Sequence, residues 1–223
     1  MLSEVREIGS SAAGVAGHGL GMAQAKSPGF LAYDLRVTLL HLSKETWRMV
    51  RVPHDIRMDR LDQVLQAAMG WTNSHMHQFH LFTAEGVITG YVGKPDPDSP
   101  AAFFGQRPKT QDETKRLLKN FLAKPGDRIG YEYDFGDSWL HDITLAAVEP
   151  LEKRLSCAAC LDGARACPPE DCGGPPGYDN LLKIIKKPKH PEYEEMIGWV
   201  GDGFDPAAFD LAGANEAVAC CKV

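Results

Sequence analysis

Residues 160–178 limit the folds open to this chain more than any other stretch, because they hold three cysteines, two proline pairs and a glycine-rich run. Proline lacks a backbone donor, and glycine loses the most conformational entropy on ordering. We therefore expect neither a helix nor an interior strand here. A loop of this length inside a compact domain is usually functional or packed on itself. The cysteines and the fixed proline dihedrals favour an ordered loop that could carry a site.

The composition and net charge limit the classes of function that we consider for this protein. The chain has 223 residues, 43% of them apolar, which is enough for one sizeable core. A net charge of −6 provides no general basic surface for nucleic acid, although a local stripe of arginines could still do so. The arginines that could form such a stripe are Arg36, Arg48, Arg51, Arg57 and Arg60.

The expected location is the cytoplasm, and no contact with a membrane is expected. The apolar runs are too short to span a bilayer, and the first residues lack the basic start and apolar middle of a signal peptide. In the cytoplasm, the six cysteines are more often reduced thiols or metal ligands than disulfides.

Apolar periodicity predicts an α+β fold. Residues 1–29 show no periodic pattern and are expected to form a flexible tail, followed by one domain over residues 30–219. Alternating residues predict strands at 31–39, 46–52, 71–82 and 87–92, and a hairpin at 128–148 with an acidic tip. Helical spacing predicts helices at 58–69, 110–122, 179–187, 191–200 and 210–219. We expect a mostly antiparallel or mixed N-terminal sheet with two helices, then the cysteine and proline loop, then short helices.

The cysteines offer a first candidate metal site. Cys157, Cys160, Cys167 and Cys172 lie within sixteen residues, and zinc is the only cofactor that this pattern suggests. Only one pair has the Cys-x-x-Cys spacing, however, whereas a zinc ribbon has two. The alternative is that the reduced thiols pack as small apolar side chains.

Three histidines offer a second candidate site. If residues 71–82 form a strand, His75 and His77 share one face, and His141 on the hairpin could join them. With Asp134 or Asp137, such a trio would suit a hydrolytic metal centre. The alternative is that these histidines form local hydrogen bonds within an ordinary sheet.

The acidic residues have two interpretations as well. Asp134 and Asp137 bracket a turn, where aspartate side chains commonly accept hydrogen bonds from the backbone. Glu170 and Asp171 follow a proline pair and could either cap the next turn or act as an acid/base pair.

The motifs resemble those of the plasmid pRiA4b Orf-three-like family, in order and over residues 31–218. The segments that carry the resemblance are YEYDFGDSW at 131–139 with His141, residues 160–163, 166–174 and 177–178, Gly70 and Trp71 with His75, His77, Gln78 and Phe79, and residues 204–206 with 209–210. Cys157 lies outside these motifs, and proteins of this kind do not always have a cysteine at the position of Cys172. The resemblance therefore leaves Cys160 and Cys167 as the stronger ligand candidates.

The resemblance implies an α+β domain of a class that is encoded on plasmids and beside insertion-sequence genes. Related proteins are sometimes labelled mobile-element passengers or resolvase-like. A serine recombinase needs a nucleophilic serine in an arginine-rich site and a DNA-binding helical tail. We can assign neither in this sequence, so the resolvase-like label is not supported. Phosphate-binding loops and the common hydrolase motifs are also absent from the sequence.

We therefore expect a non-enzymatic binding or accessory protein. Its partner would be a protein or a small molecule, and the cysteine loop, Trp139 and His141 would line the recognition groove. The alternatives are a metal-dependent hydrolase that uses His75, His77, His141 and a nearby carboxylate, and a transposition-associated factor that binds DNA.

Overall fold

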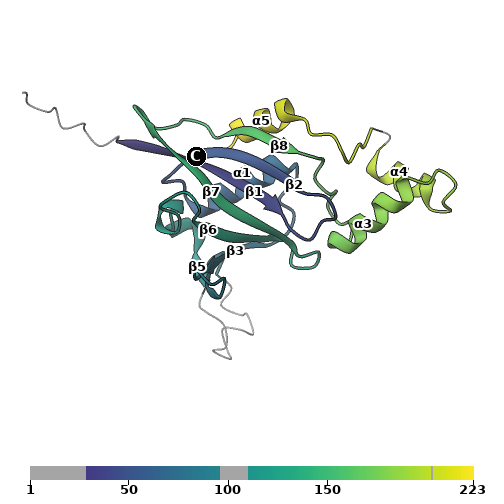
Figure 1. The fold of residues 1–223 in the computed structure, drawn as a ribbon, viewed down its shortest axis with the longest axis horizontal. Coiled ribbons are helices and arrows are strands. Elements are labelled where there is room, and N and C mark those ends of the chain that lie inside the picture. The colour runs from purple at the N-terminus through teal and green to yellow at the C-terminus, as the bar shows by residue number, and fades with distance from the viewer. Residues whose placement is uncertain (1–28, 96–109, 202) are drawn as a thin grey trace, which may run out of the picture.

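The structure is a computed structural model that describes residues 29–95, 110–201 and 203–223 (Figure 1). The predicted N-terminal tail lies outside these residues, except for Gly29. The α+β class is confirmed by one mixed sheet of eight strands. In the described part of the chain, no helix is both long and apolar enough to cross a bilayer.

The strands follow the order β5-β4-β3-β6-β7-β1-β2-β8 across the sheet, and every pair is antiparallel except β4 with β5. Their bounds are β1 Phe30–Leu39, β2 Thr46–Pro53, β3 His77–Phe82, β4 Ile88–Gly93, β5 Thr110–Asp112, β6 Arg128–Tyr133, β7 Trp139–Leu151 and β8 Ala159–Ala164. The helices are α1 Met58–Met69, α3 Gly174–Ile185, α4 Tyr193–Val200 and α5 Leu211–Ala219, with two short 3-10 turns, η1 Glu113–Lys115 and η2 Leu118–Asn120.

Alternation along the strands gives the sheet one buried face and one solvated face. The buried residues of the central strands include Leu35, Val37, Val50, Tyr131 and Ile143. On the solvated face the cross-strand neighbours include ion pairs: Arg51 Nε lies 2.6 Å from Asp34 Oδ1, directly opposite it in the register.

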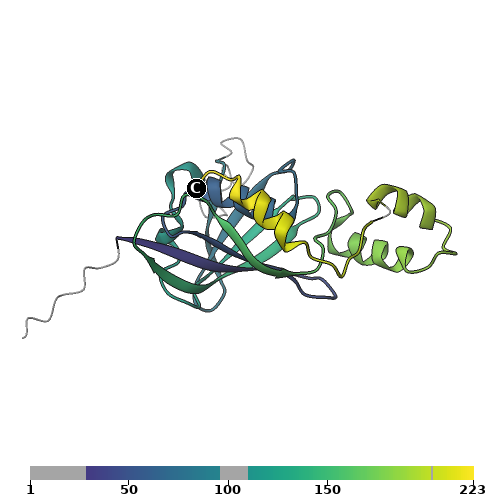
Figure 2. The ribbon, with the colours of Figure 1, turned by 90° about the horizontal axis from the view of Figure 1, so that it is seen from above.

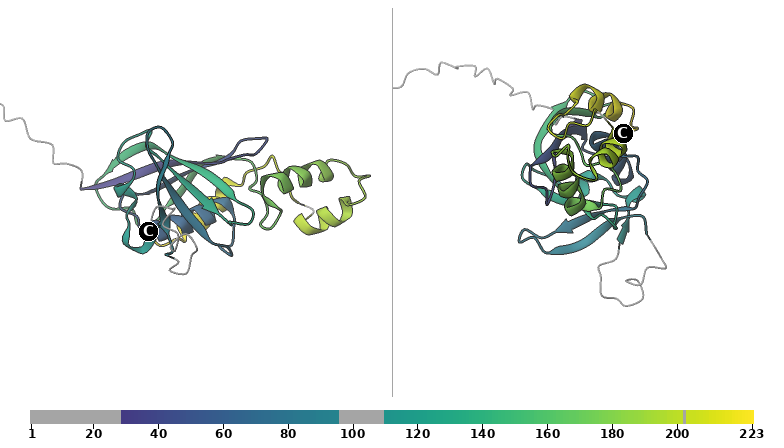
Figure 3. Two further views of the ribbon diagram at one scale, coloured as in Figure 1. Left: turned by 90° about the horizontal axis from the view of Figure 1, so that it is seen from below. Right: turned by 90° about the vertical axis from the view of Figure 1, so that its right-hand side faces the viewer.

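Two helices cover the buried face. α1 and α5 lie side by side on it (Figures 2 and 3). α1 places Leu61, Val64 and Leu65 in the core and ends at Gly70 in the left-handed conformation, as its sequence predicts. The buried Arg48 of β2 donates from Nε to the carbonyl oxygen of Ala68 at 2.9 Å, and this bond ties the end of α1 to the sheet.

Residues 110–122 do not form the predicted helix. Two of their backbone donors bind another part of the chain: Leu118 N donates to Ile56 O at 2.9 Å, and Lys119 N to His54 O at 3.0 Å. The bonds to the preceding turn are limited to short 3-10 stretches, such as Asn120 N to Leu117 O at 2.9 Å. Asp112 ends β5 and caps η1 through Thr114 N. The apolar side chains that suggested a helix, Leu118 and Leu122, are buried through this tertiary pairing.

The cysteine and proline stretch contains more regular structure than expected. β8 occupies its first residues, and β8 can be a strand here because it is the edge of the sheet. α3 begins at Gly174, five residues before the expected start, with a proline in its first turn where the missing N–H costs nothing. α3 and α4 form a pair that projects from one end of the sheet (Figures 1 and 2).

Gly174 provides a test of how closely α3 packs on the hairpin. Its φ is +66°, and an added Cβ would collide with the backbone oxygen of Asp137. We predict that Gly174→Ala lowers the free energy of unfolding by more than about 1 kcal/mol.

The matched control is Gly198→Ala, because Gly198 lies inside α4 and a methyl group added there would meet no atom within 4 Å. This change should instead stabilise the protein by about 0.5–1 kcal/mol. Urea denaturation measures both. Equal effects of the two substitutions would contradict the described packing.

Candidate functional site

Three segments that are distant in sequence meet at one end of the sheet. They are the loop 71–76 after α1, the hairpin tip 134–138 between β6 and β7, and the loop 165–173 before α3; we call this meeting point the junction. Trp71 holds two of them together: its Nε1 donates to the carbonyl oxygen of Pro168 at 2.9 Å, and its ring stacks on Tyr133 with 4.9 Å between centroids.

Glu170 is the polar centre of the junction. One carboxylate oxygen accepts from the hydroxyl of Thr72 at 2.5 Å and from the Thr72 amide at 3.3 Å, and the other accepts a short hydrogen bond from the Tyr133 hydroxyl. Partial burial raises the pKa of Glu170, but the bonds from Thr72 and Tyr133 outweigh it and hold the pKa below its ordinary value. Glu170 is therefore an acceptor that joins the loops through Thr72 and Tyr133, and it does not cap the next turn. A role for Glu170 and Asp171 as an acid/base pair stays a prediction.

His75 lies between two carboxylates at the junction surface. Its Nε2 is 3.1 Å from Asp171 Oδ1, and its Nδ1 is 3.7 Å from Asp134 Oδ2. Each of the three residues can offer one ligand atom so that all the atoms lie within 4.8 Å of one another. The structure thus brings together three of the candidate residues, from three different loops.

The two aspartates of the hairpin tip have separate roles. Asp134 Oδ1 accepts from Gly136 N at 2.9 Å within the turn, as the sequence suggested, whereas Oδ2 faces His75. Asp137 points to the other side of the tip, where its Oδ2 accepts from Gly173 N at 3.1 Å. Asp134 therefore belongs to the His75 cluster and Asp137 belongs to the packing of the loop before α3.

His77 does not join His75. The strand begins at His77, so His75 lies in the loop, and the expected alternation of the two side chains does not apply. His77 Nδ1 lies 3.2 Å from Asp62 Oδ1, and Nε2 lies 2.8 Å from Glu113 Oε2. Tyr131 also donates to Asp62, at 2.7 Å. This group is a closed network between α1, β3, β6 and η1.

The network explains the direction of the pKa shift of His77. Burial by itself would lower the pKa of His77, but the hydrogen bond with Glu113 and the charges of Asp62 and Glu113 raise it above the ordinary value. Burial, followed by the neighbouring Asp62, raises the pKa of Tyr131 well above its ordinary value, so its hydroxyl remains a donor.

His141 is also separate from His75. Its side chain is buried beneath Trp71, with 5.4 Å between ring centroids, and burial lowers its pKa to about 4. Trp139 is fully buried beside it. The groove that we expected these two residues to line is therefore filled, because both side chains are part of the core.

The four candidate cysteines are spread over the loop region. Among the described residues, the one cluster with metal-ligand spacing contains no cysteine. Burial raises the pKa of Cys167 to about 12 and that of Cys172 to about 12, so both thiols stay protonated at neutral pH. Cys160 is buried and Cys157 is exposed. Zinc bound by these thiols stays a prediction.

Several residues of the site were not predicted from the sequence. Tyr133, Thr72, Asp62 and Glu113 act through partners that are far away in the chain. One signal was available for α1, where Asp62 and Gln66 occupy buried positions one turn apart on a helix that otherwise buries apolar residues. A buried polar residue of this kind requires a partner.

The fold and the junction define a class of single-sheet α+β domains with three loops joined at one end of the sheet. The family model of the plasmid pRiA4b ORF-3-like protein matches residues 31–213, and the chain belongs to this family. It is 36% identical over 186 residues to the uncharacterized protein y4hQ of Sinorhizobium fredii, covering 82% of this chain and 89% of that protein. A crystal structure of the protein of unknown function MM3350 from Methanosarcina mazei Go1 has a TM-score of 0.70 and 29% identity, covering 82% of this chain and 96% of the other.

The His77 network predicts a pH dependence of stability. A raised pKa in the folded state means that the folded protein binds the proton more tightly than the unfolded chain does. This stabilisation is complete below about pH 6.5 and is lost as the pH rises through the folded-state value. Compared with His77→Gln, the wild type should be more stable by about 1–3 kcal/mol near pH 6, with a smaller difference at pH 9.

Urea denaturation between pH 6 and pH 9 measures this difference. His190→Gln is the control, because His190 makes no ion pair with the described residues. A difference between wild type and His77→Gln that stays constant or grows as the pH rises would contradict the assignment.

Proposed function

We propose that this protein is a non-enzymatic binding domain and that its partner contacts the junction. The observation that supports this is a pair of exposed apolar side chains beside the His75 cluster: Met76 is 54% exposed and Phe135 is 46% exposed. The two chain segments are joined, because Asp134 N donates to Met76 O at 2.9 Å. Exposed apolar side chains around fixed polar groups are typical of recognition surfaces.

The supporting frame favours recognition because it holds these loops in one arrangement. Trp71, Tyr133 and Glu170 join the loops 71–76 and 165–173 to the end of β6 through hydrogen bonds and stacking, and the bond from Asp134 N to Met76 O adds the hairpin tip. A surface that is already ordered loses less conformational entropy when a partner binds.

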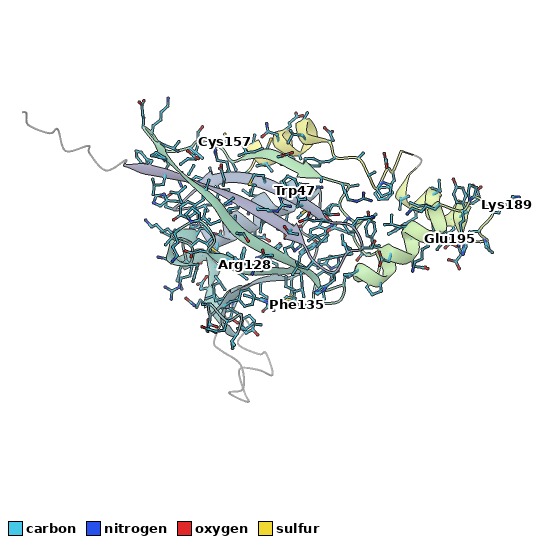
Figure 4. The ribbon with its side chains drawn as sticks, viewed as in Figure 1. Trp47, Arg128, Phe135, Cys157, Lys189 and Glu195 are labelled. Carbon is cyan, nitrogen blue, oxygen red and sulfur yellow. The ribbon has the colours of Figure 1, made fainter. Side chains whose placement is uncertain are left out.

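A neighbouring hollow extends this surface. It has a volume of about 700 Å³ and lies on the Asp137 side of the hairpin tip, against the start of α3. Its lining is His41, Asp137, Ser138, Leu140, Pro175, Pro176, Asp179 and Lys183. Figure 4 places Phe135 at the end of the sheet from which α3 projects, so a partner on this end could contact both.

The alternatives have less support. A hydrolase with three histidine ligands would need His75, His77 and His141 around one cavity, yet His77 is held by two carboxylates and His141 is in the core. For a DNA-binding, transposition-associated role, the five arginines of the suggested stripe would need to be free. Four of them pair with Glu45, Asp34 or Asp59, and Arg48 is buried against backbone carbonyls.

A capture experiment tests the proposed binding surface. The full chain is immobilised and exposed to lysate from the organism that carries the gene, and retained molecules are quantified by mass spectrometry. We expect a partner that the wild type retains and that the double variant Met76→Ser, Phe135→Ser loses by about tenfold or more.

The matched control is the double variant Val87→Ser, Ile88→Ser, because this exposed apolar pair lies in the β3–β4 turn region. It should retain the partner like the wild type. The proposal fails if no retained molecule depends on Met76 and Phe135. It also fails if the purified protein hydrolyses members of an ester and phosphodiester panel and His75→Ala removes that activity.

A further inference from the structure

The His75 cluster has an arrangement that its own hydrogen bonds do not explain. His75 Nε2 is shielded from solvent and has no hydrogen-bond partner among the described residues, although it lies 3.1 Å from Asp171 Oδ1. The ring and the carboxylate are therefore close without the alignment of a hydrogen bond. Nδ1 forms no hydrogen bond with Asp134 Oδ2 because the two atoms are 3.7 Å apart. An imidazole nitrogen without a partner is a group that requires one.

The charge of the cluster is also unbalanced. Asp134 and Asp171 converge on one imidazole, with Glu170 next in sequence, and within the described ranges neither aspartate forms an ion pair with a lysine or an arginine. The repulsion between two carboxylates is relieved by a cation between them, which either the imidazolium form of the histidine or a bound metal ion supplies.

The turn at the hairpin tip orients Asp134 toward His75. Asp134 Oδ1 is occupied by the turn amide of Gly136, so Oδ2 is directed at His75. Metal-binding carboxylates commonly have such a second hydrogen bond, which orients the ligand oxygen. The exposed fractions of the side chains are 13% for Asp134, 30% for His75 and 73% for Asp171. One side of the cluster is therefore open to an ion from solution.

From these observations we propose that the junction binds one divalent transition-metal ion through His75, Asp134 and Asp171. One imidazole nitrogen with two carboxylate oxygens suits Mn²⁺ or Zn²⁺ and is a poor match for Mg²⁺, which prefers oxygen ligands. With three protein ligands, the ion keeps open positions toward solvent.

This inference rests on the proposed function, because it names the chemistry of the same surface. An ion with open positions, held by residues next in sequence to Met76 and Phe135, would bind a donor group of the partner, such as a carboxylate or an imidazole. The partner would then be recognised by a metal bond at the centre and by apolar contacts at the rim.

Equilibrium dialysis of the full, untagged chain against Mn²⁺ or Zn²⁺, followed by elemental mass spectrometry, tests the site. We expect saturation at about one ion per chain, with Mg²⁺ competing poorly. His75→Ala and Asp134→Asn should each weaken binding by about tenfold or more. Asparagine keeps a side-chain oxygen for the turn amide, so the thermal unfolding temperature of the metal-free variant shows that the hairpin is intact.

Two controls use the same substitutions elsewhere. His190→Ala and Asp205→Asn change residues outside both the cluster and the neighbouring hollow and should bind metal like the wild type. Absence of saturable Mn²⁺ or Zn²⁺ binding overturns the proposal, and so does binding that survives both His75→Ala and Asp134→Asn. Binding that is lost on Cys160→Ser or Cys167→Ser instead would place the ion in the cysteine loop. If no metal binds but capture still depends on Met76 and Phe135, only this inference fails.

Discussion

The geometry of the junction depends on the hydrogen bonds that the carboxylate of Glu170 accepts. The loop that carries it could adopt many conformations, because it contains few residues with regular secondary structure. Hydrogen bonds from Thr72 and Tyr133 attach this carboxylate to two other segments, and its ionised form makes them charge-assisted. Since Asp171 follows directly, the position of its carboxylate near His75 is a consequence of where Glu170 is held.

A second hydrogen-bonded system supports the first from inside the fold. Tyr131 and Tyr133 are two residues apart on β6 and both point to the buried face. Tyr133 binds the loops, whereas Tyr131 binds α1, donating to Asp62 and accepting from Gln66 Nε2 at 2.8 Å. Gln66 Oε1 in turn accepts from Asn73 N at 3.2 Å. The loop after α1 is therefore held on both sides, and β6 is the strand that connects the network of His77 with the junction.

Much of the fold could be predicted because local patterns determine it. The alternation in β1 and β2, the capped helix α1 and the hairpin of β6 and β7 all follow the periodicity of their own residues. The prediction of a helix at 110–122 was wrong because the amides of Leu118 and Lys119 bind the carbonyl oxygens of Ile56 and His54, a tertiary pairing that no local pattern reports. For α3 and α4 the sequence predicts the two helices, but it does not predict that they project from the sheet.

The candidate site was partly predictable for the same reason. His75, Asp134 and Asp171 were each recognised as chemically capable residues, but only the fold shows that they meet. His77 and His141 were grouped with His75 because strand alternation was extended through residues 71–76, which form a loop. The supporting residues Thr72 and Tyr133 were missed because their common partner, Glu170, lies 98 and 37 residues away.

Hydrogen–deuterium exchange on Glu170→Gln tests most directly whether this carboxylate organises the junction. If it does, amide exchange should rise together in the loop 71–76, the hairpin tip 134–138 and the loop 165–173. The central strands β1, β2 and β7 should keep the protection they have in the wild type, since their hydrogen bonds do not involve Glu170. Faster exchange confined to residues 165–173, with the other two segments unchanged, would contradict the account.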